Sequence, residues 1–251
     1  MTPEEIERYA RHIMLREIGG PGQQKLLGAK LLCIGAGGLG SSALLYLAAA
    51  GVGTIGIVDD DEVSLSNLQR QILHDTASIG TAKTTSAKQS LARINPHLKV
   101  IEHNLRLNER NIDEVMAGYD LVLDGTDNFT TRYLVNAACV RAKLPLISAA
   151  MSQWEGQISL YDPARGGPCY QCVFPEAPAA GLAPSCAQAG VMGALAGVMG
   201  SMMAGEAIKL ITGAGQVLHG EILIYDSLYG DIRKLKASPN PACPICSSPK
   251  A

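Results

Sequence analysis

The chain contains the stretch Lys30-Leu-Leu-Cys-Ile-Gly35-Ala-Gly-Gly-Leu-Gly40, in which a strand-like apolar run meets a glycine-rich turn. An apolar helical pattern continues from this turn to about Val52. A second apolar run then ends in Asp59-Asp60-Asp61. This order of strand, glycine-rich turn, helix and strand is typical of the first unit of a Rossmann-like α/β fold.

The glycines of this turn have the spacing of a phosphate-binding loop. Gly35 permits a tight turn, Gly37, followed by Gly38, lets the backbone approach a phosphate, and Gly40 lets the helix pack on the strand. The N–H groups and dipole of the helix start attract the anion. Asp59 lies where a ribose hydroxyl would bind. The pattern alone fits a dinucleotide dehydrogenase as well as an enzyme that uses ATP.

Composition narrows the class of protein. A chain of 251 residues with 47% hydrophobic content can bury a core without disulfides. The net charge of -2 offers no general attraction to nucleic acid or anionic membranes, so phosphate recognition has to be local. Residues 1–16 resemble a charged amphipathic helix and not a secretory leader. We expect a cytoplasmic protein that binds neither nucleic acid nor a membrane.

Strand and helix patterns alternate along the chain, which predicts a mostly parallel sheet with helices on both faces and a mixed or antiparallel continuation after Ser148. The expected helices cover 6–15, a short segment after Gly22, 80–94, 130–142 and 189–205, and the expected later strands cover 99–102, 119–124, 145–149, 155–161, 221–226 and 231–236. We expect one domain over 1–251, with an N-terminal helical arm at 1–28 and a flexible crossover loop at 174–186.

Several polar residues lie near expected strand ends, where open α/β sheets bind ligands. Asn67 and Arg70 follow the second strand and are candidates for phosphate contacts. Lys83, on the next helix, is either a surface lysine or a phosphate ligand. Asp127 is either a helix N-cap, as Thr126 or Asn128 would be, or a functional carboxylate. By pattern alone, the arginines of the first helix form a solvated basic face.

Four of the seven cysteines form two C-x-x-C pairs. Two such pairs can supply the four thiolates of a closed tetrahedral zinc site, and no thioredoxin-like setting supports redox chemistry instead. Although 70 residues separate the pairs, we expect a structural zinc that clamps the tail onto the body. The proposed ligands are Cys169, Cys172, Cys243 and Cys246.

Two further features of the second half leave alternatives open. Cys186, beside the crossover loop, is either a nucleophile or an unpaired bystander. The run 189–205 is apolar enough for a membrane span, but five glycines interrupt it, and we expect a buried helix instead. Its small residues Gly193, Gly197, Ser201 and Gly205, spaced by four, would allow close approach of another backbone and weakly suggest a homodimer.

Together these residues resemble the ThiF/MoeB/HesA family, bacterial relatives of the ubiquitin-activating enzymes, over nearly the whole chain. The motifs that carry the resemblance are Arg8-Tyr-Ala-Arg11, the glycine turn, the run from Asp59 to Gln71, Lys83, Asp124-Gly-Thr-Asp127-Asn, the two cysteine pairs and Cys186-Ala-Gln-Ala-Gly-Val. Many relatives have a cysteine where this chain has Gly125. The pattern is similar to both molybdopterin-synthase and thiamin-pathway adenylyltransferases.

The resemblance implies one adenylation domain that joins ATP to the C-terminal glycine of a small ubiquitin-like sulfur carrier ending in Gly-Gly. It further implies Mg²⁺, a structural Zn²⁺, a homodimer and a sulfur donor such as a cysteine desulfurase or rhodanese. The implied roles are Asp127 for Mg²⁺, Asp59 for the ribose, Asp61 for the nucleotide site, Asn67, Arg70 and Lys83 for the phosphates, Arg11 for the nucleotide of a neighbouring subunit, and Cys186 for a later transfer step.

Two other classes of function compete with this one. A nicotinamide oxidoreductase would need a catalytic proton donor, and none of the five histidines lies in an evident catalytic motif. A non-catalytic zinc-bearing scaffold for a ubiquitin-like protein would not need the full set of charged residues.

Overall fold

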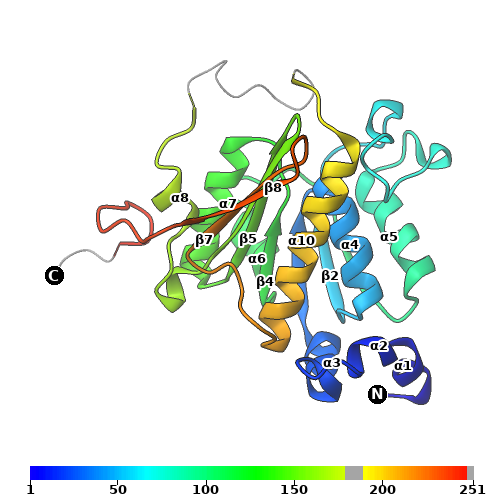
Figure 1. Cartoon of the computed structure of the whole chain (residues 1–251). Helices are drawn as coiled ribbons and strands as arrows, with labels where there is room; N and C mark the ends of the chain where they lie inside the picture. Colours follow the sequence, from blue (N-terminus) through cyan, green and yellow to red (C-terminus); the bar gives the residue numbers. More distant parts are fainter. Residues whose placement is uncertain (179–188, 248–251) are drawn as a thin grey trace.

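The computed structural model describes residues 1–178 and 189–247 and contains an eight-stranded sheet in the order β3-β2-β1-β4-β5-β6-β7-β8 (Figure 1). The strands are β1 (Lys30–Ile34), β2 (Thr54–Val58), β3 (Lys99–His103), β4 (Leu121–Asp124), β5 (Leu146–Ser152), β6 (Glu155–Tyr161), β7 (Glu221–Asp226) and β8 (Asp231–Lys236). Strands β1 to β5 pair in parallel, and β6 to β8 continue the sheet antiparallel. The predicted α/β sheet is confirmed.

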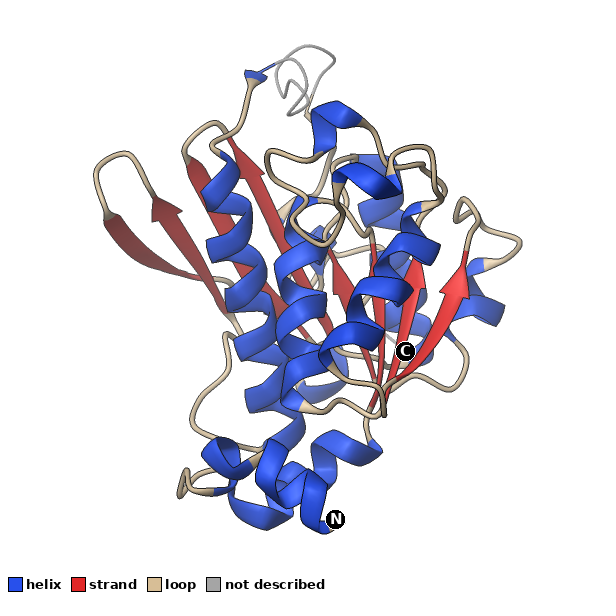
Figure 2. Ribbon diagram, turned by 90° about the vertical axis from the view of Figure 1, so that its right-hand side faces the viewer, coloured by secondary structure: helices blue, strands red, loops and turns tan. Residues whose placement is uncertain are grey.

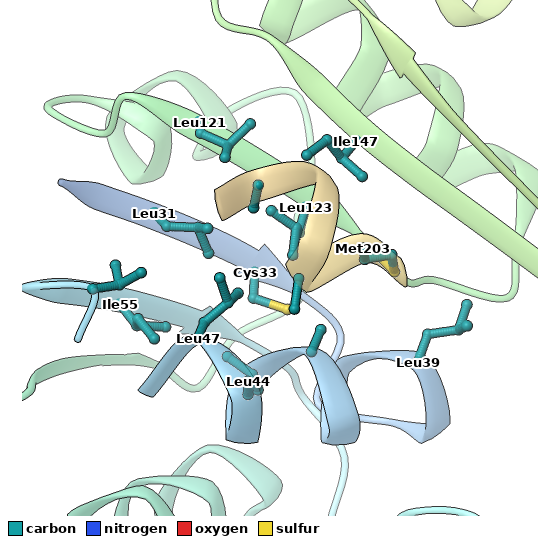
Figure 3. Close-up of a cluster of buried hydrophobic side chains, with 14 of the residues drawn as sticks. Leu31, Cys33, Leu39, Leu44, Leu47, Ile55, Leu121, Leu123, Ile147 and Met203 are labelled. Atoms are coloured by element: carbon teal, nitrogen blue, oxygen red, sulfur yellow. The ribbon is translucent and has the colours of Figure 1, made fainter. Parts of the chain in front are cut away.

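Helices cover both faces of this sheet, as predicted (Figure 2). The helices are α1 (Pro3–Arg8), α2 (Ala10–Ile13), α3 (Gly19–Gly28), α4 (Gly38–Ala50), α5 (Lys83–Ile94), α6 (Ile112–Met116), α7 (Phe129–Ala142), α8 (Tyr170–Val173) and α10 (Gly193–Thr212). The strands alternate between two cores because successive side chains point to opposite faces. Leu31 and Cys33 join α4, α5 and α10, as Figure 3 shows in part, whereas Leu32 and Ile34 join α6 and α7.

The glycine turn has the conformation that its sequence predicts. Gly35 has φ +93°, in the region that only glycine adopts readily. A Cβ atom on Gly40 would overlap the carbonyl oxygen of Gly35, so glycine is required there for α4 to pack this close to β1. The first turn of α4 therefore begins directly behind the loop.

Within the chain, the glycines of the expected small-residue stripe of α10 do not share one packed face, and close approach of a partner chain to them stays a prediction. A Cβ atom on Gly197 or Gly205 would meet open space, whereas one on Gly200 would overlap the carbonyl oxygen of Leu39 in α4. A helix turns about 100° per residue, so residues spaced by four drift by about 40° at each step and leave the packed face. Of the three glycines in the predicted set, Gly193 is the one that lies tightly against another backbone among the described residues, at Gln69.

Helix α10 is long and apolar enough to cross a membrane. It nevertheless packs along α4 and against β5 and β6, where it covers one face of the sheet (Figure 1). The helix begins later and ends later than the predicted range 189–205. Its additional last turns lie beside α3. Its apolar character is therefore explained by burial in the core.

The predicted first helix, 6–15, is broken into α1 and α2. The break falls at Tyr9, which is 3% exposed and accepts a hydrogen bond of 2.9 Å from Asn95 Nδ2. Its ring also lies against Gly51, where a Cβ atom would clash with it. A contact made by the folded chain, and not local propensity, sets this break.

Candidate functional site

A cavity of about 770 Å³ opens at the carboxyl ends of β1 and β4. The strand order reverses between these two strands, which is the position where open α/β sheets bind ligands. The volume is in the range of small-molecule sites. The glycine loop and the segments that follow β2 and β4 form one end of this cavity, and β5 and β6 form the other.

Most of the predicted site residues meet at this cavity. Those that line it are Gly35, Gly37, Gly38, Asp59, Asp61, Arg70, Lys83 and Asp127. Gly40 lies behind them in the first turn of α4. Asn67 is not part of the lining, and its Oδ1 atom accepts a hydrogen bond of 3.2 Å from the amide of Ser64 in its own turn. Cys186 lies outside the described residues.

Arg11 belongs to helix α2, which lies beside α3 near the N-terminus of the chain (Figure 1). Arg11 is exposed and follows Tyr9 closely in the sequence. The ring of Tyr9 lies against Gly51, which directly precedes β2, so this part of the chain is near the start of β2. The cavity lies at the other end of β2, whose five residues span about 16 Å. Arg11 therefore does not line the cavity of its own chain.

Asp59 ties the end of β2 to the glycine loop. Its Oδ2 atom accepts a hydrogen bond of 2.8 Å from the amide of Ala36, and its Oδ1 atom accepts one of 3.0 Å from the amide of Asp61. Burial raises the pKa of Asp59, although the charge of Lys83 and the two amides act against this rise. A carboxylate oxygen that accepts one hydrogen bond keeps a further lone pair, so Asp59 can still accept a ribose hydroxyl.

Lys83 is a buried cation and not a surface lysine. Its side chain is 6% exposed, and Nζ lies 2.7 Å from Asp61 Oδ2 and 4.0 Å from Asp59 Oδ1. Arg70 adds a second cation, whose Nη1 donates to the carbonyl of Ser66 at 3.0 Å. Two cations beside a glycine loop suit a polyphosphate ligand.

Asp127 is not the cap of α7, because Asn128 takes that role with its Oδ1 atom 2.9 Å from the amide of Thr131. Asp127 is exposed at the cavity wall, and its carboxylate makes no hydrogen bond within residues 1–178 and 189–247. Carboxylates in such positions, together with substrate phosphates, are the ligands that Mg²⁺ prefers.

Two residues of the cavity wall were missed in the sequence. Gln71 is 4% exposed, and its Oε1 atom is buried without a hydrogen-bond partner among the described residues. Arg132 is 5% exposed and donates to Ser148 Oγ at 2.9 Å and to the carbonyls of Ala149 and Thr126. It thereby fixes the loop that carries Asp127. Gln71 could have been noticed because it is adjacent to Arg70 in the sequence. Arg132 gave no such signal, because two of its hydrogen-bond partners, Ser148 and Ala149, come from β5, which is distant in the sequence.

The two cysteine pairs meet, as predicted. The Sγ atoms lie 3.8 Å apart in Cys169 and Cys172, 3.6 Å apart in Cys169 and Cys243, and 3.3 Å apart in Cys172 and Cys246. A tetrahedral zinc site with bonds of about 2.3 Å separates its sulfurs by about 3.8 Å, so the donor set fits zinc. Burial raises the pKa of Cys169 to about 11, and a bound cation would reverse this effect by stabilising the thiolate.

Comparison with known proteins agrees with this geometry. The ThiF family model matches residues 9–245. A sulfur carrier protein adenylyltransferase of Thermus thermophilus is 45% identical over 249 residues, which cover 98% of this chain and 92% of that protein. The probable adenylyltransferase/sulfurtransferase MoeZ of Mycobacterium tuberculosis is 48% identical over 247 residues, which cover 97% of this chain but only 63% of MoeZ.

A crystal structure of E. coli MccB with ATP has the same fold, with a TM-score of 0.77, 26% sequence identity, and coverage of 91% of this chain and 70% of MccB. None of these relatives supports the nicotinamide oxidoreductase. In the described residues, none of the five histidines lines the cavity either. The chain belongs to the ThiF family.

Proposed function

We propose that this protein adenylates the C-terminal glycine of a small ubiquitin-like sulfur-carrier protein in an ATP-dependent and Mg²⁺-dependent reaction. The observation that carries the proposal is the gathering of Lys83, Arg70 and Asp127 around the glycine loop at one end of the cavity. The relatives named as sulfur carrier protein adenylyltransferase and as MoeZ support the same reaction.

In the proposed reaction, a carboxylate oxygen of the carrier forms a bond to the α-phosphorus of ATP. The bond from that phosphorus to the bridging oxygen of the β-phosphate breaks, and pyrophosphate leaves with the electron pair. The carboxylate is ionised at neutral pH, so no general base is needed, and catalysis reduces to alignment and to neutralisation of phosphate charge.

The cavity residues divide these tasks. Lys83 and Arg70 offset the phosphate charge, and Lys83 has to exchange its ion pair with Asp61 for a phosphate oxygen when ATP binds. Asp59 accepts a ribose hydroxyl. Asp127 would hold Mg²⁺, which would supply positive charge to polarise the phosphate.

The other end of the cavity receives the carrier tail. It lies beyond the glycine loop and is lined by Ala150, Gly156 and Gln157 of β5 and β6 and by Phe174. A tail that ends in glycines has no side chains at its end, so it can enter this space in an extended conformation without steric overlap. The described part of the crossover loop, 174–178, borders the same end, and we assign the later sulfur or acyl transfer to Cys186 farther along it.

The remaining assignments complete the proposal. Zn²⁺ held by the four cysteines is structural, because a fourth thiolate leaves no open coordination position. The sulfur donor is a cysteine desulfurase or a rhodanese. The reaction takes place in the cytoplasm, which keeps free thiols such as Cys33 and Cys139 reduced.

We expect pyrophosphate to exchange into ATP only when a carrier with an intact C-terminal Gly-Gly is present. The exchange requires reversible formation of the acyl-adenylate, so a carrier without its last two residues should give background rates. Incorporation of labelled pyrophosphate into ATP measures the reaction. A non-catalytic scaffold predicts no exchange with any carrier, and exchange that is independent of the tail would contradict the proposed acceptor.

We propose further that the active unit is a homodimer in which Arg11 reaches the nucleotide of the partner. Arg11 is exposed on α2, outside the cavity lining of its own chain, and its Nη1 atom lies 3.9 Å from Met14 Sδ. The apolar residues Ile6, Met14 and Leu15, which are close to Arg11 in the sequence, are also exposed. A two-fold dimer that covers these residues could bring Arg11 to a second cavity.

Mixing the inactive variants Arg11→Ala and Asp127→Ala should restore about a quarter of wild-type activity. In a mixed dimer with Arg11 acting in trans, both lesions fall in one site, and random pairing makes about half of the dimers mixed. Pyrophosphate exchange is measured after subunit exchange has been verified by mass spectrometry. A mixture of Lys83→Met and Asp127→Ala, which are lesions of the same cavity, is the control and should stay inactive. Failure of the first mixture to recover would rule out the shared site.

A further inference from the structure

Ala36, within the glycine loop, is held from behind by two side chains, one on each of its backbone polar groups, and the peptide group between Ala36 and Gly37 is held through its carbonyl. The amide of Ala36 donates to Asp59 Oδ2 at 2.8 Å. The carbonyl oxygen of Ala36 lies 2.9 Å from His74 Nε2. His74 is 6% exposed and is not part of the cavity lining, so it touches the loop only on the side away from the ligand space.

The hydrogen-bond partners of His74 determine its tautomer. A carbonyl oxygen can only accept, so the proton has to be on Nε2. The lone pair of Nδ1 then accepts from the hydroxyl of Ser86, whose Oγ atom is 2.8 Å away. Ser86 lies on α5, three residues after Lys83. Burial lowers the pKa of His74, which favours this neutral ring.

Peptide geometry connects this contact to the ligand space. The peptide bond between Ala36 and Gly37 is trans, so the carbonyl of Ala36 and the N–H of Gly37 point in opposite directions within one plane. Because the carbonyl points back to His74, the N–H of Gly37 points away from it. That N–H has no acceptor in the described part of the chain, and Gly37 lines the cavity.

We infer that His74 is a positioning residue that locks this peptide, so that the N–H of Gly37 is presented to the phosphates of ATP. The inference rests on the proposed function for the identity of the ligand. Glycine at both Gly35 and Gly37 lets the intervening peptides rotate easily, and a rotation of the peptide after Ala36 would turn a carbonyl dipole toward the phosphates. Through Ser86, the same ring holds α5, and with it Lys83, at a fixed distance from the loop.

The test is calorimetric binding of ATP to the whole protein without a carrier, so that failure of carrier adenylation leaves the result readable. His74→Leu should bind ATP about tenfold more weakly, as expected for one lost hydrogen bond. His74→Gln, which keeps an N–H donor and an oxygen acceptor, should bind within about twofold of wild type. Adenosine, which has no phosphate, should bind to all three proteins equally.

Three results would overturn the inference: wild-type ATP affinity in His74→Leu, an equal loss of adenosine affinity, or a defect in His74→Gln as large as in His74→Leu. A purely structural histidine would lower the thermal stability of the variants without this dependence on the phosphates. Nitrogen-15 spectra of the wild-type imidazole decide the matter if His74→Leu does not fold. They should show the proton on Nε2, and a proton on Nδ1 would refute the lock.

Discussion

Replacing Asp127 by alanine should lower pyrophosphate exchange by about 10³-fold or more, because the change removes the proposed magnesium ligand from the cavity. Stability should remain within about 0.5 kcal/mol of wild type, since the exposed carboxylate makes no hydrogen bond in the described residues and does not cap α7. Exchange assays and urea unfolding of the same preparation measure both quantities.

Two variants serve as controls for Asp127→Ala. Asn128→Ala removes the actual cap of α7 and should cost about 1 kcal/mol of stability. Asp113→Ala removes an exposed carboxylate of α6 that pairs with Arg141, and it should leave exchange unchanged. Near-wild-type exchange in folded Asp127→Ala would refute the magnesium assignment.

Replacing Cys172 by alanine should release the metal and lower the free energy of unfolding by several kcal/mol. The purified wild-type protein should contain about one Zn²⁺ per chain, and the energy of binding to a structural site contributes to folding. The effect should be large because the cluster joins two segments that are distant in the sequence. The turn at Cys169 precedes α10 and the final hairpin, and the turn at Cys243 follows them. Elemental analysis and denaturant unfolding measure the two effects.

Cys139→Ala is the matched control for the zinc prediction. Cys139 is 2% exposed in the core on α7, so its loss should cost about 1 kcal/mol of packing and leave the zinc content unchanged. Wild-type protein without metal, or with the four cysteines joined as disulfides under reducing conditions, would contradict the zinc site.

Local sequence patterns predicted the parts of the fold whose geometry is local. The expected strand from Glu155 to Tyr161 matches β6 at both ends, and the expected final hairpin matches β7 and β8. In these strands, side chains alternate between the faces of an antiparallel sheet, so the pattern has the period of the structure. The glycine turn was predictable because positive φ and close packing both require glycine there.

Contacts between distant segments could not be predicted in this way. Tyr9 breaks the first helix because its hydroxyl meets Asn95, and Gly200 packs on Leu39 because α10 crosses α4 at that point. Gln71 and His74 were missed because burial beside the loop, which the sequence does not show, gives them their roles. The charged residues Lys83 and Asp127 were found because the family motif, and not the local pattern, singled them out.

The first turn of α4 is in backbone contact on two sides. Gly40 of this turn lies against the glycine loop, and Leu39 lies against Gly200 of α10. Residues packed in this way have little conformational entropy left to lose. ATP would therefore meet amide groups that folding has already ordered, and little of its binding free energy would be lost in organising the phosphate end of the cavity.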